Sequence, residues 1–238
     1  MKLIQRAIGK AVHVAHTAVA GMLPAKGRVL MLHWVGDEVQ DAETEPFRVS
    51  TEAFCGLVAW LKGQNTIRLE EWEGHNDFYA LTIDDVPENF YHNAFPVLKE
   101  YEVPFTIFVN TSLLDTPGFI MTGQLREMAA WPLCTVGSHG TGHVLYHTLD
   151  KAGKREHLTQ SKAMLEKAIG RPVEIYAYPY GSVYACGHTD KHLATQVYKY
   201  AFGTIACPIT KPRLLPKYFL PRINVSERYI NTLIENGK

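Results

Sequence analysis

Several features that point to specialised protein classes are scarce or absent in this sequence. It contains four cysteines, and no two of them form a C-x-x-C pair, so neither a disulfide scaffold nor a thiolate zinc site is predicted. Lys plus Arg and Asp plus Glu both total 24, which leaves no basic excess for binding nucleic acid phosphates. No uninterrupted apolar run reaches the length of about 18 residues that a membrane-spanning helix requires.

The composition of the chain is typical of a single globular domain. Its 238 residues are 46% hydrophobic, which is enough for a packed core. The sequence shows no internal repeat, no linker and no break in composition. Cys134 and Cys207 lie in apolar stretches and are expected to be buried, reduced thiols, which fits a cytoplasmic location.

The first residues carry a helical pattern. Apolar residues recur at steps of three and four from residue 2 to residue 23, and Pro24 ends the pattern. We therefore expect an amphipathic helix over residues 1–24 and a domain over 25–238. The helix can pack on that domain, lie on a membrane surface as a basic amphipathic helix, or be a signal peptide. His13 and His16 interrupt the apolar region that a signal peptide needs, so none is expected.

Short apolar runs alternate with amphipathic stretches through the rest of the chain. The runs predicted as strands are 28–33, 78–83, 105–110, 134–138, 174–178, 200–204 and 218–224. Helices are predicted at 50–62 and 122–130, capped by Ser50 and Thr122, and at 89–101 and 155–169. This alternation predicts an α/β fold with a parallel sheet inside a layer of helices. A small or incomplete (β/α) barrel fits best, and an open doubly wound sheet is the alternative.

Polar residues follow four of the predicted strands directly. They are His33, the pair Asp84-Asp85, His139, and the segment Tyr178–Gly181. Because the carboxyl ends of parallel strands meet at one edge of a sheet or barrel, these side chains are expected to lie close together. That edge is where both architectures place their chemistry.

Two of these groups have the residue types of a metal site. The adjacent carboxylates of Asp84 and Asp85 repel each other unless a metal or an arginine is nearby, although they could also form a polar turn. His139 and His143, four apart in a glycine-containing loop, could chelate an ion or be an incidental pair. One Asp and two His supply the three protein ligands usual in a catalytic zinc site.

At these positions the sequence resembles the polysaccharide deacetylases (carbohydrate esterase family four). Thr82-Ile83-Asp84-Asp85-Val86 resembles their first motif, His139 to His143 matches the second, H-x-x-x-H, and Ala177-Tyr178-Pro179-Tyr180-Gly181 resembles the third. The resemblance covers residues 28–225 and is closest to the exopolysaccharide N-deacetylase branch. It implies a distorted seven-stranded (β/α) barrel, in agreement with the strand pattern. The N-terminal amphipathic helix is expected in addition, from the helical pattern of the first residues.

The resemblance also implies an activity and a set of roles. Family members use a divalent metal to remove acetyl groups from N-acetylated sugars, here of a surface polysaccharide or glycolipid precursor. Asp85, His139 and His143 match the metal ligands, and Asp84 matches the general base. The backbone N–H of Tyr180 matches the oxyanion donor. Zn²⁺ suits these ligands best, and Co²⁺, Ni²⁺ and Fe²⁺ bind similar sets.

Three departures from the family pattern leave two roles to other residues. Val86 replaces the usual glycine, Ala177 replaces the usual arginine, and the late Leu-x-His motif is absent. We expect His33 to be the general acid, because residues 31–35 resemble an early histidine segment of the exopolysaccharide branch; a core histidine is the alternative. We expect Arg222 to pair with Asp84, and a surface arginine is the alternative.

The loops at the strand ends also suggest how substrate binds. Trp34, Tyr146 and Tyr178 are predicted to contact the sugar, together with Pro179, which fixes the loop of the third motif; core packing is the alternative for the rings. Asn110 is a lesser candidate for contacting sugar or framing the metal site.

The expected partner is an acetylated carbohydrate, and no nucleic acid is expected. Peripheral membrane contact through residues 1–24 and a cytoplasmic or membrane-associated location are further expectations. Two other functions stay open: hydrolysis of another small amide or ester, such as a cyclic ureide, and carbohydrate binding without catalysis.

Overall fold

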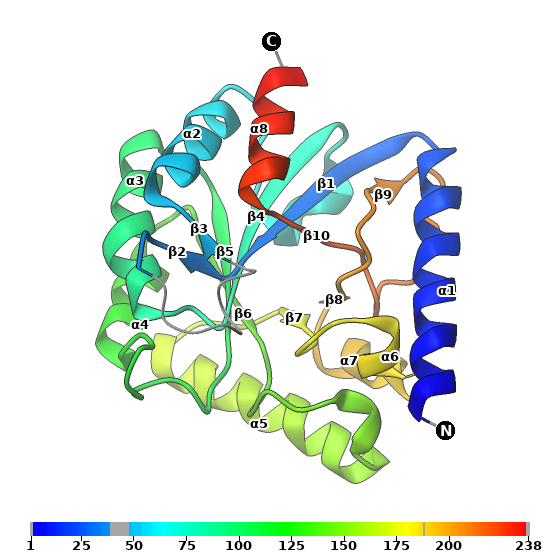
Figure 1. Ribbon diagram of the computed structural model, residues 1–238. Coiled ribbons are helices and arrows are strands. Elements are labelled where there is room, and N and C mark those ends of the chain that lie inside the picture. The colour runs from blue at the N-terminus through cyan, green and yellow to red at the C-terminus, as the bar shows by residue number, and fades with distance from the viewer. Residues whose placement is uncertain (1, 39–47, 188, 237–238) are drawn as a thin grey trace.

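A curled, mainly parallel sheet forms the centre of the molecule (Figure 1). The computed structural model describes residues 2–38, 48–187 and 189–236. Within them the strand order is β10-β1-β4-β5-β6-β7-β8, and β9 (Ile209–Thr210) pairs antiparallel with β1. The strands of this order are β1 (Ala25–Leu32), β4 (Phe78–Asp84), β5 (Phe105–Val109), β6 (Cys134–Ser138), β7 (Ile175–Ala177), β8 (Tyr200–Phe202) and β10 (Ile223–Asn224). A separate parallel pair joins β2 (Trp34–Val35) to β3 (Arg48–Val49).

The last stretch of the sheet nearly closes it into a barrel. Leu220 forms a parallel bridge with Phe202 of β8, and Ile223 pairs with Leu30 of β1. Residues 220–224 therefore contact both edges of the sheet, which agrees with the expected distorted (β/α) barrel. Of the strand predicted over 218–224, only Ile223–Asn224 is a strand, because Pro221 has no N–H to donate to a ladder.

The barrel interior is packed with side chains. Val29, Phe78, Phe108 and Phe202 are among the buried residues of one apolar cluster that fills it. Gly137 lies where an aromatic ring presses on the backbone, because a Cβ at this position would be 2.5 Å from the Phe108 ring. The interior is therefore a solid core, and chemistry is confined to its mouth.

Helices cover the outside of the sheet (Figure 1). They are α2 (Thr51–Lys62), α3 (Phe95–Tyr101) after a π-helical turn (Phe90–Ala94), α4 (Thr122–Ala130), α5 (Lys151–Ile169), α6 (Val183–Cys186), α7 (Ala194–Val197) and α8 (Glu227–Asn236). Short 3₁₀ turns lie at Leu69–Gly74, Tyr146–Thr148 and Lys191–Leu193. Ser50 caps α2 as predicted, since its hydroxyl accepts from the Ala53 N–H. Thr122 is the first residue of α4 rather than its cap, because Asp115 binds both its amide and its hydroxyl.

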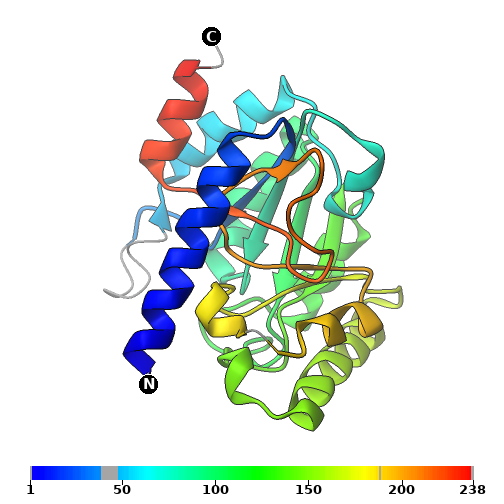
Figure 2. The same ribbon diagram turned by 90° about the vertical axis from the view of Figure 1, so that its right-hand side faces the viewer.

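The N-terminal helix α1 (Lys2–Gly21) lies along the side of the barrel, against α6 (Figure 2). Gly9 sits directly on Tyr184, where a Cβ would be only 3.2 Å away, and Ala20 is buried. The expectation of a helix packed on the domain is confirmed. Among the described helices, none has both the length and the apolar character needed to cross a bilayer.

Candidate active site and metal centre

Strand β4 delivers two adjacent carboxylates in different directions. It ends at Asp84, and the next two residues, Asp85 and Val86, have φ values of 59° and 53°. Such left-handed backbone is costly for a β-branched residue, and it suits the glycine that the family has at the position of Val86. The turn sends Asp84 toward the barrel interior and Asp85 toward the histidine loop.

Asp84 is held by Arg222 in a bidentate ion pair. Nη1 and Nη2 of Arg222 donate to Oδ1 and Oδ2 of Asp84 at 2.6 and 2.7 Å, and both side chains are buried. The guanidinium also donates to the Gly203 carbonyl at 3.1 Å and lies over the Phe108 ring. Burial is the largest single effect and would raise the pKa of Asp84. The charge of Arg222, the nearby His139 and His33 and the hydrogen bonds from Arg222 together outweigh it and lower this pKa to about 2. The contact expected between these two residues is present.

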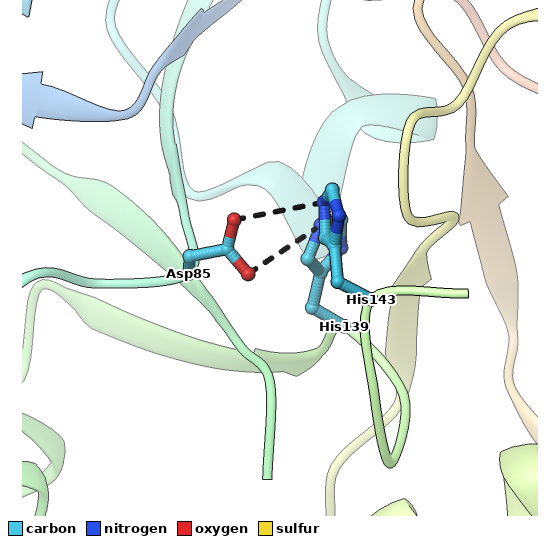
Figure 3. A group of neighbouring side chains, drawn as sticks. All are labelled: Asp85, His139 and His143. Carbon is cyan, nitrogen blue, oxygen red and sulfur yellow. Dashed lines mark ion pairs between the residues drawn. The ribbon is translucent and has the colours of Figure 1, made fainter. Parts of the chain in front are cut away.

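Asp85, His139 and His143 form the candidate metal cluster (Figure 3). Nε2 of His139 and Nε2 of His143 lie 4.0 and 3.8 Å from the Asp85 carboxylate oxygens. The donor atoms of the three residues all lie within 4.8 Å of one another. Donor atoms of a tetrahedral zinc site are roughly 3.4 Å apart, so a contraction of this group would place all three on one ion and leave a fourth position open. The three residues therefore fit a divalent ion, because one carboxylate and two imidazoles are a donor set that catalytic metal sites use.

The surroundings leave the ligand atoms available. Nδ1 of His139 donates to the Ala177 carbonyl at 2.8 Å, so Nε2 of this ring keeps its lone pair toward Asp85. Burial lowers the pKa of His143, although the nearby Asp85 carboxylate opposes this, and favours the neutral form that binds metals. Asn110, fully buried, donates to Asp85 Oδ1 at 3.4 Å and thus frames the cluster.

A pocket of about 550 Å³ opens above these groups. Its apolar walls are Met31, Trp34, Pro87 and Phe119, and Tyr180 adds an exposed ring 4.1 Å from that of His143. An aromatic and apolar wall beside a polar floor suits the two faces of a sugar ring.

His33 lines the same pocket as both carboxylates. Burial lowers its pKa below the ordinary 6.5, while the charges of Asp84 and Asp85 oppose this in part. The neutral ring is therefore favoured near neutral pH, and the protonated form increases as the pH falls.

The third-motif loop presents the Tyr180 backbone to the pocket. Tyr180 and Gly181 have φ values of 59° and 55°, and the Thr204 N–H donates to the Gly181 carbonyl at 2.8 Å. Within the described part of the chain, the Tyr180 N–H has no backbone acceptor. Pro179 is buried beneath the turn, where it fixes the loop rather than lining the pocket.

Besides Pro179, two predicted substrate contacts are corrected by the structure. Tyr146 and Tyr178 are fully buried and pack edge to face at 5.1 Å, outside the pocket. The Tyr178 hydroxyl lies 3.0 Å from the carbonyl oxygens of both Lys191 and Tyr218, and the Tyr146 hydroxyl donates to the Asp190 carbonyl at 3.3 Å. Their hydroxyls are thus satisfied by backbone, and both rings are core residues. Trp34, by contrast, does lie on the pocket wall.

The sequence reasoning missed two polar residues of the pocket rim. Thr204 and Asn224 line it, and they end the predicted strands 200–204 and 218–224. The rule used for the other strands, that chemistry lies at strand ends, would have found both.

Three comparisons with known proteins agree with this geometry. The family model described as polysaccharide deacetylase matches residues 73–198. The chain is 28% identical over 219 residues to the poly-beta-1,6-N-acetyl-D-glucosamine N-deacetylase of Staphylococcus epidermidis, covering 81% of this chain and 73% of that protein. A crystal structure of a polysaccharide deacetylase from Bacillus cereus matches with a TM-score of 0.75 and 25% identity, over 88% of this chain and 69% of that one. IcaB from Ammonifex degensii shares the fold, with a TM-score of 0.71 and 24% identity over 90% and 98% of the two chains.

Proposed function

Because the chain belongs to the polysaccharide deacetylase family of metal-dependent carbohydrate deacetylases, we propose that it removes acetyl groups from N-acetylated sugars of a surface polysaccharide or of its glycolipid precursor. The observation that carries this proposal is the cluster of Asp85, His139 and His143 beside the Arg222-paired Asp84, in one pocket. Zn²⁺ is the metal we propose, since one carboxylate and two imidazoles suit it; Co²⁺, Ni²⁺ or Fe²⁺ could replace it.

Each residue has a task in hydrolysis of the acetamide. When bound, the metal would polarise the acetyl carbonyl and make a water more acidic. Asp84, ionised and oriented by Arg222, accepts a proton from the attacking water. The Tyr180 N–H donates to the oxyanion that develops on the carbonyl oxygen. The C–N bond then breaks, acetate departs, and His33 supplies the proton that the amine needs.

We propose an extended, uncharged polymer as the substrate, such as the poly-β-1,6-linked N-acetylglucosamine for which the staphylococcal relatives are named. A second hollow, of about 600 Å³, shares Trp34 with the catalytic pocket and gives a chain room to continue. Asp37, Glu38 and Glu88 line this hollow. Their charges suit neutral or amine-bearing sugars and oppose a polyanion.

The experiment is an acetate-release screen with the Zn²⁺-loaded protein. Oligomers of N-acetylglucosamine with β-1,6 linkages are expected to release acetate faster than O-acetylated sugars. Opening of a cyclic ureide without acetate release would favour the other hydrolase. Sugar binding with no hydrolysis of an activated acetyl ester would favour the non-catalytic alternative.

We also propose that α1 attaches the protein to the surface of an anionic membrane, on its cytoplasmic side. Among the described residues, four of the nine exposed large apolar side chains lie on this helix, Ile4, Ile8, Val14 and Val19, and a fifth, Met22, follows its last residue. Residues 1–36 contain no Asp or Glu, but they contain Lys2, Arg6, Lys10, Lys26 and Arg28. An apolar face with basic and no acidic neighbours has the chemistry of a membrane-surface helix.

Co-sedimentation with anionic vesicles tests this attachment in the full chain. The double change Ile8→Asp and Val19→Asp should abolish binding, because it places charges on the exposed face of α1. Met164→Asp on α5, at a methionine exposed to 51%, is the matched control and should bind as the wild type does. Equal sedimentation of all three proteins would rule out α1 as the attachment.

A further inference from the structure

The loop that carries the two candidate imidazole ligands rests on helix α5. At Gly140, φ is +85°, and a Cβ there would lie 2.0 Å from Nε2 of His157 and 2.2 Å from its Cε1. The His157 ring is therefore pressed against the backbone of the loop. It is 5% exposed, so this contact is buried.

His157 also bonds to the next residue of the loop. Its Nδ1 lies 3.4 Å from the Thr141 amide nitrogen and 3.0 Å from the Thr141 hydroxyl oxygen. Because an amide N–H only donates, Nδ1 must accept, and the ring proton is on Nε2. Burial lowers the pKa of His157 to about 4, which keeps the ring in this neutral, accepting form.

One helical turn further along α5, Ser161 contacts the start of the same loop. Its hydroxyl lies 2.8 Å from that of Ser138, and Ser138 in turn accepts from the Gly140 N–H at 3.1 Å. Helix α5 thus contacts the segment before the first imidazole and again midway to the second. Two glycines, Gly140 and Gly142, leave the segment little stiffness of its own.

The two candidate ligands depend on α5 to different degrees. The His139 ring is already held by its hydrogen bond to the carbonyl of Ala177, a residue of β7. His143 lies two residues beyond Thr141, and its side chain is 36% exposed. The contact between His157 and Thr141 therefore bears chiefly on where His143 lies.

We propose that His157 is a positioning residue, which holds Thr141 so that His143 faces Asp85 at the separation that one divalent ion requires. This inference rests on the metal centre of the proposed function. It is not itself a ligand, since the cluster of donor atoms found in the described residues consists of Asp85, His139 and His143. Such supporting groups typically change metal affinity by about 10- to 100-fold.

The test measures Zn²⁺ affinity of the metal-free full chain by competition with a chelating indicator. His157→Leu keeps an apolar side chain of similar size but removes the acceptor, and should weaken Zn²⁺ binding by about 10- to 100-fold. His157→Asn places an oxygen near the position of Nδ1 and should restore most of the affinity. His192→Leu, at an exposed histidine on the 3₁₀ turn Lys191–Leu193, is the matched control and should bind as the wild type does.

Each outcome decides the proposal. A folded His157→Leu protein, with the melting temperature and the Zn²⁺ affinity of the wild type, would overturn it. If that variant does not fold, Thr141→Val decides, because it removes the hydroxyl from the other side of the contact and leaves α5 intact. Unchanged affinity in Thr141→Val would overturn the proposal, and reduced affinity would support it. A wild-type chain that binds no divalent metal would contradict the proposed function itself.

Discussion

Asp84 and Asp85 are neighbours in the chain, yet they belong to two differently built regions of the site. The inner region is closed: Asp84 is buried and held by two hydrogen bonds from a buried arginine. The outer region is open: Asp85 is 18% exposed and faces two imidazoles across 3.8 to 4.0 Å. The inner geometry is complete with protein atoms alone, whereas the outer one leaves room for an ion.

This difference explains how two identical side chains can have two tasks. A carboxylate already paired with arginine keeps its charge and position and can accept a proton. A carboxylate that faces two imidazoles and has no arginine partner can share its lone pairs with a metal. Variants that change one region and leave the other intact therefore test whether the two regions act separately.

The largest effect is expected from Asp84→Asn. The amide cannot accept the proton of the attacking water, so kcat should fall by about 10³-fold. The outer region is untouched, so Zn²⁺ affinity should stay within the error of the wild type. Steady-state kinetics and a chelator competition on the same sample measure both quantities. Loss of metal binding along with activity would show that the two regions are not separate.

Arg222→Met removes the inner partner instead of the base. It leaves a buried carboxylate without its cation, and the free energy of unfolding should fall by about 3–5 kcal/mol. Without Arg222, burial raises the pKa of Asp84, so activity should now decline as the pH falls through that raised value. Urea unfolding and a pH–rate profile are the measurements.

The control for this change is Arg213→Met. Arg213 lies 3.9 Å from Glu73 at the surface, where a pair contributes about 0–1 kcal/mol. If the free energy of unfolding falls equally in both variants, burial of the ion pair between Asp84 and Arg222 does not explain the loss.

His33→Gln tests the acid in the same pocket and should lower kcat by about 10²-fold, with normal metal content. The pKa of His33 is lowered by burial, so its protonated form is lost as the pH rises through a value below 6.5. The ratio of wild-type to variant kcat should therefore decrease as the pH rises. A ratio that stays constant with pH would remove His33 from the role of acid.

The smallest effect is expected from Val86→Gly, at the turn between the two regions. Glycine relieves backbone strain of about 1–3 kcal/mol at a positive φ, but it loses a buried side chain of similar value. The net change in unfolding free energy should be within about 1 kcal/mol. Val109→Gly, in strand β5 and equally buried, has no strain to relieve and should cost clearly more. Equal costs would show that the turn is unstrained.

The sequence predicted those site residues that directly follow a strand. Apolar runs predict a strand directly before Asp84 and another before His139. Because Ala177 stands where the family has an arginine, another cation had to pair with Asp84, and Arg222, 138 residues further along the chain, does so. The same rule, applied to every strand, would have added Thr204 and Asn224.

Other features depend on tertiary packing that sequence patterns do not encode. Nearness to a motif does not fix the direction of a ring, so Tyr178 was expected at the pocket but is buried in the core. The sequence pattern of the helix that carries His157 does not indicate a contact with the loop that ends at His143, 14 residues earlier. Only the packing of α5 under Gly140 reveals that contact.

The most direct test of the central claim is a metal reconstitution experiment. The protein is stripped with a chelator, and acetate release from an N-acetylglucosamine oligomer is measured while Zn²⁺ is added in known amounts. We predict no activity without metal, a linear return that ends at one equivalent, and no return in a His143→Ala protein. Full activity in the stripped wild-type protein, or equal recovery in His143→Ala, would contradict the claim that Asp85, His139 and His143 hold the ion on which the reaction depends.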